Sequence, residues 1–230
     1  MLKRLFDVMI ALGGLVATSP LLITIMFWIK KDSAGPIFYR GNRVGKGGAE
    51  FKIYKFRSMV RDADKSGVTS TSLKDSRITT SGHFIRKWKL DELAQLINVV
   101  KGDMSLVGPR PEVKEFTDLY REEEKKILLL RPGITDWASI WNSDEGGILE
   151  GALDADAVYL KVIRPVKIEL QLYYYHNSSF SNDIKILFYT VYRIFKSSFV
   201  PGNLSAYSDY GTLRRQAMVV IDEQRKLGKG

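Results

Sequence analysis

Two adjacent acids, Asp91 and Glu92, begin the stretch of sequence with the clearest chemical content. Apolar residues then recur at spacings of three and four, which predicts one apolar helix face ending at Gly102 (Leu90, Leu93, Leu96, Ile97 and Val100). A helix N-terminus has unpaired N–H groups and a partial positive charge, so it stabilises acids and attracts phosphate. With the basic residues at 86–89 before it, the acid pair suits a metal and phosphate site. Simple helix capping by Asp91 is the alternative interpretation.

A stiff turn, Gly108-Pro109-Arg110-Pro111, follows this helix pattern. The proline rings fix φ on both sides of Arg110, and a turn that only connects two elements does not need an arginine there. The planar guanidinium can bind two phosphate oxygens at once, which a lysine cannot do. Arg110 is therefore a candidate substrate-binding residue. The same argument makes Arg77 and Arg86 candidates, with a surface charge as the alternative for Arg86.

Five segments of the chain resemble, in order, the core signature of the bacterial sugar transferases, the monotopic polyprenyl-phosphate phosphoglycosyl transferases. They are KRLFD at 3–7, the segment 36–59 that ends in YKFRSM, DSRITTSGHFIRK at 75–87, LDELAQLINVVKGDMSLVGPRPE at 90–112, and RPGIT at 131–135. Two positions depart from the family pattern. Ala94 stands where proline is usual, and a helix's first turn tolerates alanine because proline there only presets the backbone. Asp136-Trp137 stands where Gly-Trp is more usual, which bears on the subgroup and not on the chemistry.

The resemblance implies transfer of a phospho-sugar from a UDP-sugar to polyprenyl phosphate (undecaprenyl phosphate), with release of UMP, as the first step of surface glycan assembly. It implies that Asp91 is the nucleophile of an Asp-Glu dyad, that Arg86 lies near the substrate phosphate, and that Arg110 binds nucleotide and substrate. We expect Glu92 to bind Mg²⁺, a hard cation that accepts carboxylate and phosphate oxygens together. Lys55 and Arg57 add cations from a neighbouring strand, or form a solvated strand face.

Composition limits the class of protein. The chain has 230 residues, a formal net charge of +9 and a pI near 9.5, which together imply an anionic partner. It has no cysteine, which excludes disulfides, metal thiolates and thiol catalysis. Two histidines are too few for a histidine-rich metal site.

Residues 8–29 contain no charge and would span about 33 Å as a helix, enough to cross the hydrocarbon of a bilayer. Basic pairs lie at both ends (Lys3, Arg4, Lys30 and Lys31), and both pairs favour the cytoplasmic side. Pro20 should kink the helix and Ser19 can bond a carbonyl that Pro20 frees. The residues alone leave a kinked span and a re-entrant hairpin equally open. The resemblance implies a break at Ser19-Pro20 and a return to the cytoplasmic face of the bacterial inner membrane.

Several other segments have readable patterns. Residues 36–40 and 50–56 predict a β-hairpin around a glycine-rich turn, and residues 60–74 predict a mobile loop that could cover the site. Residues 112–130 predict one amphipathic helix with an ion pair between Glu122 and Lys126. Helices are also predicted at 166–175, 183–199 and 212–226. The helix at 183–199 suits either the membrane interface or an aromatic core, and the last is an oligomer contact or a dispensable tail.

The expected fold is therefore α+β and mostly helical. A re-entrant membrane helix is expected at 1–31, a compact cytoplasmic catalytic domain at 32–199 and a C-terminal tail at 200–230. The catalytic domain should contain a small β-hairpin and interfacial amphipathic helices. The expected partners are a UDP-sugar, polyprenyl phosphate and the lipid bilayer, with homo-oligomerisation left open. A membrane-tethered nucleic-acid binder is the alternative that basic charge supports, although no nucleic-acid-binding motif is present. A non-enzymatic scaffold would leave Asp91, Glu92 and the Gly-Pro-Arg-Pro turn without a purpose.

Overall fold

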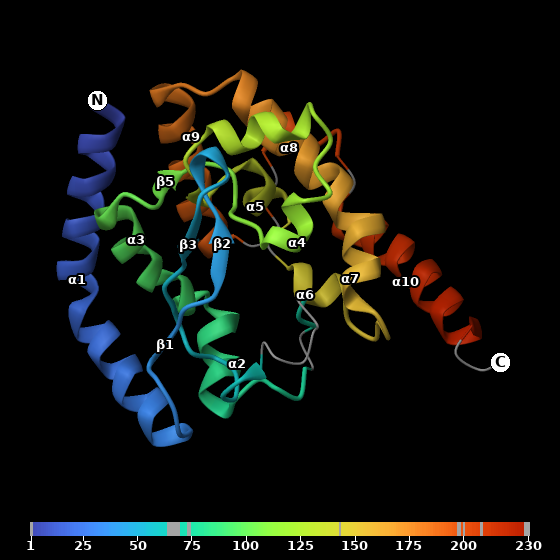
Figure 1. Ribbon diagram of the computed structural model, residues 1–230, viewed down its shortest axis with the longest axis horizontal. Coiled ribbons are helices and arrows are strands. Elements are labelled where there is room, and N and C mark those ends of the chain that lie inside the picture. Colours follow the sequence, from blue (N-terminus) through green and yellow to red (C-terminus); the bar gives the residue numbers. More distant parts are fainter. Residues whose placement is uncertain are drawn as a thin grey trace.

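The computed structural model describes residues 2–63, 70–72, 75–142, 144–196, 199, 201–207 and 209–227. Within these ranges the chain is mostly helical and contains three separate two-stranded sheets, as the α+β prediction requires. Most of the loop predicted at 60–74 lies outside the described residues. Figure 1 shows the long helix α1 along one side of the molecule, the strands near the middle, and the C-terminal helix on the opposite side.

The elements follow one another as α1 (Leu2–Asp32), β1 (Phe38–Tyr39), β2 (Asn42–Val44), η1 (Lys46–Gly48), β3 (Glu50–Lys52), β4 (Lys55–Phe56), α2 (Thr80–Lys87), η3 (Leu90–Ala94), α3 (Gln95–Lys101), β5 (Ser105–Val107), α4 (Lys114–Thr117), η4 (Glu124–Leu129), β6 (Gly133–Thr135), α5 (Trp137–Trp141), α6 (Glu145–Ile148), α7 (Ala155–Val158), η5 (Tyr159–Ile163), α8 (Arg164–His176), α9 (Phe180–Phe195), η6 (Gly202–Leu204) and α10 (Tyr210–Leu227).

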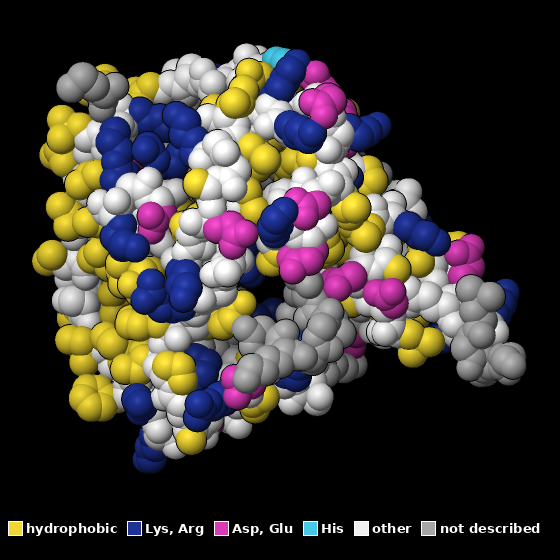
Figure 2. All heavy atoms as spheres, viewed as in Figure 1, with side chains coloured by type: hydrophobic (Ala, Val, Ile, Leu, Met, Phe, Trp, Pro, Cys, Tyr) yellow, Lys and Arg dark blue, Asp and Glu magenta, His cyan; other side chains and the backbone are white. Residues whose placement is uncertain are grey.

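Helix α1 is apolar on its outer face as well as on its inner face. Ala11, Ile25 and Ile29 are buried against the body of the protein, whereas Val16 and Phe27 are each 74% exposed. Figure 2 shows the resulting band of hydrophobic side chains along this edge of the molecule. By length and composition, α1 is the one helix in the described part of the chain that is long and apolar enough to cross a membrane.

The predicted break at Ser19 and Pro20 is not an interruption of the helix, because α1 continues without a gap through both residues. Pro20 has no N–H for the carbonyl of Val16, four residues earlier. The Ser19 hydroxyl donates to that same carbonyl at 2.8 Å, as the sequence suggested. This local replacement explains how the helix stays continuous, and Figure 1 shows it bowed around the body of the protein.

Both ends of α1 are bound to the same globular body. At the N-terminal end, Lys3 Nζ lies 2.5 Å from Asp183 Oδ2, and Arg4 donates to main-chain carbonyls at and beyond the end of α3. At the C-terminal end, Asp32 accepts hydrogen bonds from the main-chain N–H and the hydroxyl of Ser81. Both ends of α1 are therefore held by the same folded body.

Asp7 is buried, with an exposed fraction of 2%. Its carboxylate accepts a hydrogen bond from the Ser105 hydroxyl at 2.7 Å and another from the N–H of Leu106. The carboxylate is therefore bonded inside the protein and is not paired with the nearby Arg4. Strand β5 packs against α1 and supplies the donors instead.

The predicted β-hairpin is confirmed as two short antiparallel ladders. β1 pairs with β4 and β2 pairs with β3, with Phe38 opposite Phe56 and Arg43 opposite Phe51. Asn98 of α3 fixes the returning strand, because its amide accepts from the N–H of Tyr54 and donates to the carbonyl of Lys52. Lys55 is consequently held next to the segment that carries the two acids.

A parallel pair of strands, β5 and β6, was not predicted. Ser105 lies opposite Gly133 and Val107 opposite Thr135. Gly108 and Gly133 pack backbone to backbone so closely that a Cβ on either residue would lie within 2.3 Å of main-chain atoms of the opposite segment. This contact requires glycine at both positions and fixes the start of the turn that carries Arg110.

The single helix predicted at 112–130 is wrong. The segment forms a short helix, α4, and a separate 3₁₀ helix, η4. At the start of η4 the buried Glu124 accepts hydrogen bonds from the N–H of Arg121 and from the guanidinium of Arg164. These bonds hold the chain in a turn. The predicted pair of Glu122 with Lys126 is replaced by i,i+3 pairs of Lys125 with Glu122 and Lys126 with Glu123.

The predicted helices of the C-terminal half are confirmed as α8, α9 and α10. Helix α9 has two apolar faces, since Ile186 is fully buried whereas Phe188 and Phe195 are 65% and 85% exposed. Three α10 residues lie in the main core: Leu213, Ala217 and Ile221. The described part of the segment predicted as a tail is thus packed against the rest of the protein.

Candidate active site

The two acids lie in the first turn of η3, a 3₁₀ segment that leads directly into α3. Lys89, just before them, has a left-handed backbone with φ of 53°, one of two described non-glycine residues with positive φ. This conformation separates η3 from the end of α2 and is uncommon for a lysine. Because a 3₁₀ helix has about three residues per turn, Asp91 and Glu92 point about 120° apart.

Glu92 is bound by two cations from different parts of the chain. Arg110 spans both carboxylate oxygens, with Nη1 at 3.2 Å from Oε2 and Nη2 on Oε1. Lys55 of β4 donates to Oε1 at 3.2 Å. The three side chains are between 18% and 32% exposed, so water screens their charges only in part.

The electrostatics of this cluster follow from burial and from the cations. Burial alone would raise the pKa of Glu92, but Arg110 and Lys55 outweigh it and hold that pKa well below its usual range. Glu92 raises the pKa of Arg110 in return. Burial lowers the pKa of the Lys55 ammonium, and Glu92 opposes that shift. Glu92 is therefore fixed as an anion between two positive charges.

Asp91 is in a different environment, although it is the next residue. It is 7% exposed, and its carboxylate has no hydrogen bond or ion pair with any residue in the described ranges. Burial raises the pKa of Asp91; Lys55 lowers it and the Glu92 charge raises it further. Asp91 thus keeps its oxygen lone pairs available for a ligand, while Glu92 uses its own to bind cations.

Arg86, in the last turn of α2, faces the same region. Its charge lowers the pKa of both Asp91 and Asp75, and its guanidinium has no ion pair within the described part of the chain. Arg77 is held by Asp75 through two parallel contacts, Nε to Oδ1 at 2.9 Å and Nη2 to Oδ2 at 2.7 Å. The structure therefore places Arg86 close enough to Asp91 for its charge to be felt there, whereas Arg77 is paired with Asp75.

Arg57 is not brought to the acids. Its buried guanidinium donates to the carbonyls of Ile29, Ser33 and Ala34 at and just beyond the C-terminal end of α1. The last carbonyls of a helix have no partners within the helix, so a cation there stabilises the helix end. The structure thus gives Arg57 a role in holding α1, whereas Lys55, two residues earlier, reaches Glu92.

Asp136 holds the turn that carries Arg110 and was not singled out as a functional residue. Its Oδ2 accepts the N–H of Arg110 at 3.1 Å, and its Oδ1 caps α5 through Ser139. The amide of Gln171 also reaches Asp136 Oδ2, at 3.4 Å. An aspartate directly before an apolar helical run is an N-cap signal that could have identified Asp136 from the sequence. The departure from Gly-Trp at this position therefore adds a side chain that positions Arg110.

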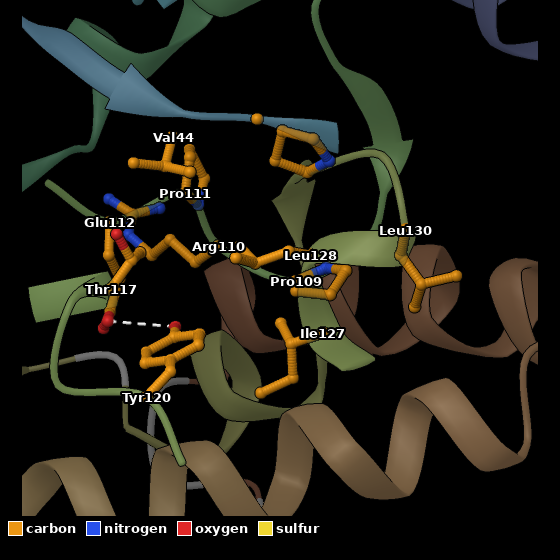
Figure 3. A pocket seen from close by; sticks show the side chains of 12 residues that line it. Val44, Pro109, Arg110, Pro111, Glu112, Thr117, Tyr120, Ile127, Leu128 and Leu130 are labelled. Carbon is orange, nitrogen blue, oxygen red and sulfur yellow. Dashed lines mark hydrogen bonds between the residues drawn. The ribbon is translucent and has the colours of Figure 1, made fainter. Parts of the chain in front are cut away.

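A buried ionic network holds the other end of the same turn. Lys167 Nζ lies 2.7 Å from Glu112 Oε1, Tyr120 donates to Glu112 Oε2 at 3.1 Å, and Tyr159 donates to Oε1. Figure 3 shows Glu112 and Tyr120 joined by this hydrogen bond, with Pro109, Arg110 and Pro111 lining the same small pocket. Glu112 was part of the quoted motif, but nothing in the sequence connected it to Lys167.

The donor set fits a magnesium ion that is shared with a substrate. No cluster of three or more His, Cys, Asp or Glu side chains that could hold a metal occurs among the described residues. Mg²⁺ usually binds one or two carboxylates and completes its shell with phosphate oxygens and water. Asp91 and Glu92 could supply those carboxylates, although Glu92 would have to share its oxygens with Arg110 and Lys55.

Comparison with known proteins gives consistent matches. A family model described as bacterial sugar transferase matches residues 1–197. The chain is 39% identical over 196 residues to a UDP-N-acetylgalactosamine-undecaprenyl-phosphate N-acetylgalactosaminephosphotransferase of Aeromonas hydrophila, which covers 84% of this chain and 43% of that protein. It is 37% identical over 201 residues to a UDP-glucose:undecaprenyl-phosphate glucose-1-phosphate transferase of Escherichia coli, covering 85% of this chain and 40% of the relative.

A third relative is similar in length to the chain. The uncharacterized sugar transferase EpsL of Bacillus subtilis is 36% identical over 197 residues, which cover 85% of this chain and 88% of that protein. The chain thus spans about two fifths of the length of the Aeromonas and Escherichia proteins and most of the length of the Bacillus protein.

Proposed function

Because the chain belongs to the bacterial sugar transferase family, we propose that it transfers a phospho-sugar from a UDP-sugar to undecaprenyl phosphate and releases UMP. The Aeromonas and Escherichia relatives act on undecaprenyl phosphate according to their names, and both names specify a UDP-sugar. The reaction would begin the assembly of a surface glycan on a lipid carrier.

The unequal environment of Asp91 and Glu92 is the observation that carries this proposal. A nucleophilic carboxylate needs a free lone pair, and Asp91 has no partner among the described residues. A phosphate site needs fixed cations, and Arg110, Lys55 and Arg86 lie around the acids. Phosphoryl transfer depends mainly on positioning and charge neutralisation, which this arrangement can supply.

In the first step an Asp91 oxygen attacks the phosphorus that carries the sugar. A bond from that oxygen to phosphorus forms, the bond from the phosphorus to the bridging oxygen breaks, and its electron pair leaves with UMP. Carboxylates act as nucleophiles towards phosphorus in other enzymes. Arg110 and Arg86 would hold the phosphate oxygens while charge shifts to the leaving group.

In the second step an oxygen of the lipid phosphate attacks the same phosphorus. The bond from phosphorus to Asp91 breaks, the carboxylate is restored, and the lipid diphosphate sugar is released. A bound magnesium ion would neutralise phosphate charge in both steps. Using one carboxylate twice means that the site never has to hold both anionic substrates at one time.

The position of α1 supports a monotopic arrangement in which the catalytic part lies on the cytoplasmic side. Lys3 and Asp32 each contact the globular body at opposite ends of the helix. A helix bound at both ends to one folded body does not need to place its ends on opposite sides of a bilayer. Its exposed apolar face can enter the membrane instead, and the basic flanks favour the cytoplasmic side.

Release of UMP is the experiment that tests the proposed function. The full chain, purified in detergent, would be incubated with Mg²⁺, undecaprenyl phosphate and one of three donors: UDP-glucose, UDP-galactose or UDP-N-acetylgalactosamine. We expect UMP to appear with at least one donor and to require the chain and Mg²⁺. UDP-glucuronic acid and UDP-N-acetylglucosamine extend the panel. Absence of UMP across the whole panel contradicts the proposed donor class.

A further inference from the structure

A basic cavity lies at the N-terminal end of α1, away from the acids. It has a volume of about 230 Å³ and is lined by Lys3, Arg4, Asp7, Ser105, Val107, Leu130, Arg131 and Tyr174. None of these residues contacts Asp91 or Glu92. Arg4 contacts carbonyls at the far end of α3, and Val100 lies nine positions beyond Asp91 along the helical segment, which corresponds to about 14 Å. The cavity is therefore distinct from the candidate active site.

The positive charge of this cavity is only partly neutralised within the protein. Lys3 is paired with Asp183, which also accepts from Tyr174. Arg4 donates only to neutral main-chain carbonyls, and the guanidinium of Arg131 has no hydrogen bond or ion pair with any residue that the structure describes. Two arginine charges consequently remain available to an anion.

The acidic groups at the cavity do not compete for these arginines. The Asp7 carboxylate already accepts from the Ser105 hydroxyl and from the N–H of Leu106, and it is almost fully buried. Asp183 is occupied by Lys3 and Tyr174. Figure 2 shows Lys and Arg side chains gathered beside this end of α1.

The edge of the cavity is apolar and exposed. Leu2 and Leu5 on the adjoining turns of α1 are 67% and 60% exposed, and Phe6 packs edge-on against Phe180 of α9 at 5.2 Å. A basic cavity bordered by exposed apolar side chains suits a ligand with a charged head and a hydrocarbon tail. Its volume is below the range of about 300–1,000 Å³ that is common for whole small-molecule ligands, so a headgroup fits better than a nucleotide sugar.

We propose that this cavity binds the phosphate headgroup of an anionic membrane phospholipid, with Arg131 as the principal ligand and Arg4 and Lys3 beside it. The bound lipid would fix the N-terminal end of α1 at the membrane surface. The inference rests on the membrane association of the proposed function but not on the transfer reaction. A binding measurement without donor or acceptor therefore tests it separately.

The test uses soluble short-chain lipids and the full chain in a neutral detergent. Dihexanoyl phosphatidylglycerol would be titrated while the thermal midpoint of unfolding is measured, with dihexanoyl phosphatidylcholine and inorganic phosphate as parallel ligands. We expect the anionic lipid to raise the midpoint. Arg131→Gln should weaken its apparent affinity about ten- to a hundredfold, the range for loss of one charge-assisted contact. Arg131 has no partner to lose among the residues that the structure describes, so this variant should fold normally.

Arg215→Gln is the matched control, because Arg215 is exposed on α10 and bonds only the neighbouring Thr212 hydroxyl. It should respond to the anionic lipid as the wild type does. Equal responses of wild type and Arg131→Gln, or no response of either, overturn the site. A response to inorganic phosphate as strong as that to the lipid overturns the headgroup assignment and identifies a free phosphate site. A response to phosphatidylcholine as strong as that to phosphatidylglycerol overturns the requirement for net negative charge.

Discussion

The guanidinium of Arg110 spans both carboxylate oxygens of Glu92, with Nη1 at 3.2 Å from Oε2 and Nη2 on Oε1. This parallel contact depends on the planar fork of arginine, which a lysine cannot reproduce. Glu92 therefore orients Arg110, the residue that we expect to bind phosphate, and the two side chains must be considered as one unit.

Arg110→Lys tests whether geometry or charge matters at this position. We expect kcat/KM to fall roughly ten- to a hundredfold, because the charge stays and the fork is lost. Arg110→Ala should fall at least as far. UMP release under steady-state conditions measures the effect, and Arg215→Lys on the exposed face of α10 is the control. Full activity of Arg110→Lys would show that a point charge is enough.

Asp91→Asn and Glu92→Gln should separate the two acids. Incubation of the wild type with UDP-sugar and Mg²⁺, without lipid, should add the mass of one phospho-sugar at Asp91. Asp91→Asn should lose this adduct and reduce turnover by about 10³-fold or more, as expected for removal of a nucleophile. Glu92→Gln should keep the adduct but form it slowly and require more Mg²⁺. Intact mass and peptide mapping measure the adduct. Appearance of UMP only after lipid is added would favour direct transfer.

Arg57 and Arg86 should respond differently to alanine substitution. Arg57 binds the end of α1, so Arg57→Ala should destabilise the protein by about 1.5–3 kcal/mol. That loss corresponds to a midpoint roughly 3–12 °C lower for a chain of this size. Arg86→Ala removes no ion pair within the described part of the chain, so it should leave the midpoint unchanged and reduce turnover. Thermal unfolding and UMP release, measured on both variants, decide the point. A stable Arg57→Ala with weakened substrate binding would restore Arg57 as a binding residue.

The Glu112 and Lys167 pair should govern part of the stability at neutral pH. Burial would raise the pKa of Glu112, but Lys167 outweighs it and the pKa is lowered. A carboxyl with a lowered folded-state pKa stabilises the protein above its unfolded value of about 4.3, and this stabilisation is lost as the pH falls through the folded value. Glu112→Gln leaves Lys167 buried without its anion and should cost about 3–5 kcal/mol at pH 7.5.

The pH dependence and a double variant provide the control for this pair. The stability difference between wild type and Glu112→Gln should shrink as the pH is lowered below about 4, because the wild type then loses the same charge. Glu112→Gln combined with Lys167→Met should recover much of the loss at pH 7.5, since no uncompensated charge remains. Denaturant unfolding at both pH values measures this. A difference that is independent of pH would mean that packing, not charge, holds the turn.

Single cysteines at positions 2 and 31 test the arrangement of α1, and the natural absence of cysteine makes the labelling unambiguous. We expect a membrane-impermeant thiol reagent to label both positions from the same side in sealed vesicles. The expectation follows from the contacts of both helix ends with one body. Labelling from opposite sides would show that α1 crosses the bilayer.

The local features of the fold could be predicted because they depend on neighbouring residues. The hairpin, the stop at Gly102 and the placement of Asp91 and Glu92 in a first turn all follow from spacing and turn chemistry. The helix predicted at 112–130 failed because Glu124 bonds Arg164, 40 residues away, and that contact overrides the helical pattern. The parallel pairing of β5 with β6 likewise depends on tertiary packing and not on the local sequence of these short segments.

The candidate site shows the same division. Lys55 and Arg57 are two residues apart, and the sequence made both of them candidates in the same way. In the structure β4 ends at Phe56, and Arg57 bonds carbonyls at the C-terminal end of α1, which are in reach only because α1 packs there. The supports of Arg110 come from residues that lie 26 and 61 positions later, Asp136 and Gln171. Contacts of this kind depend on how the elements pack, which a single sequence does not specify.

The contact between Lys3 and Asp183 has a consequence for the order of events during synthesis. The two residues are 180 positions apart, so the ribosome has finished α1 long before the partner of its first turn exists. At about 5–20 residues per second, α1 must wait roughly 10–40 s for Asp183. The partners of its inner face, among them α3, are made earlier in that interval, but its outer apolar face has no protein to cover it even after folding. Helix α1 therefore has to bind the membrane, or a chaperone, before the domain that later holds its two ends has folded.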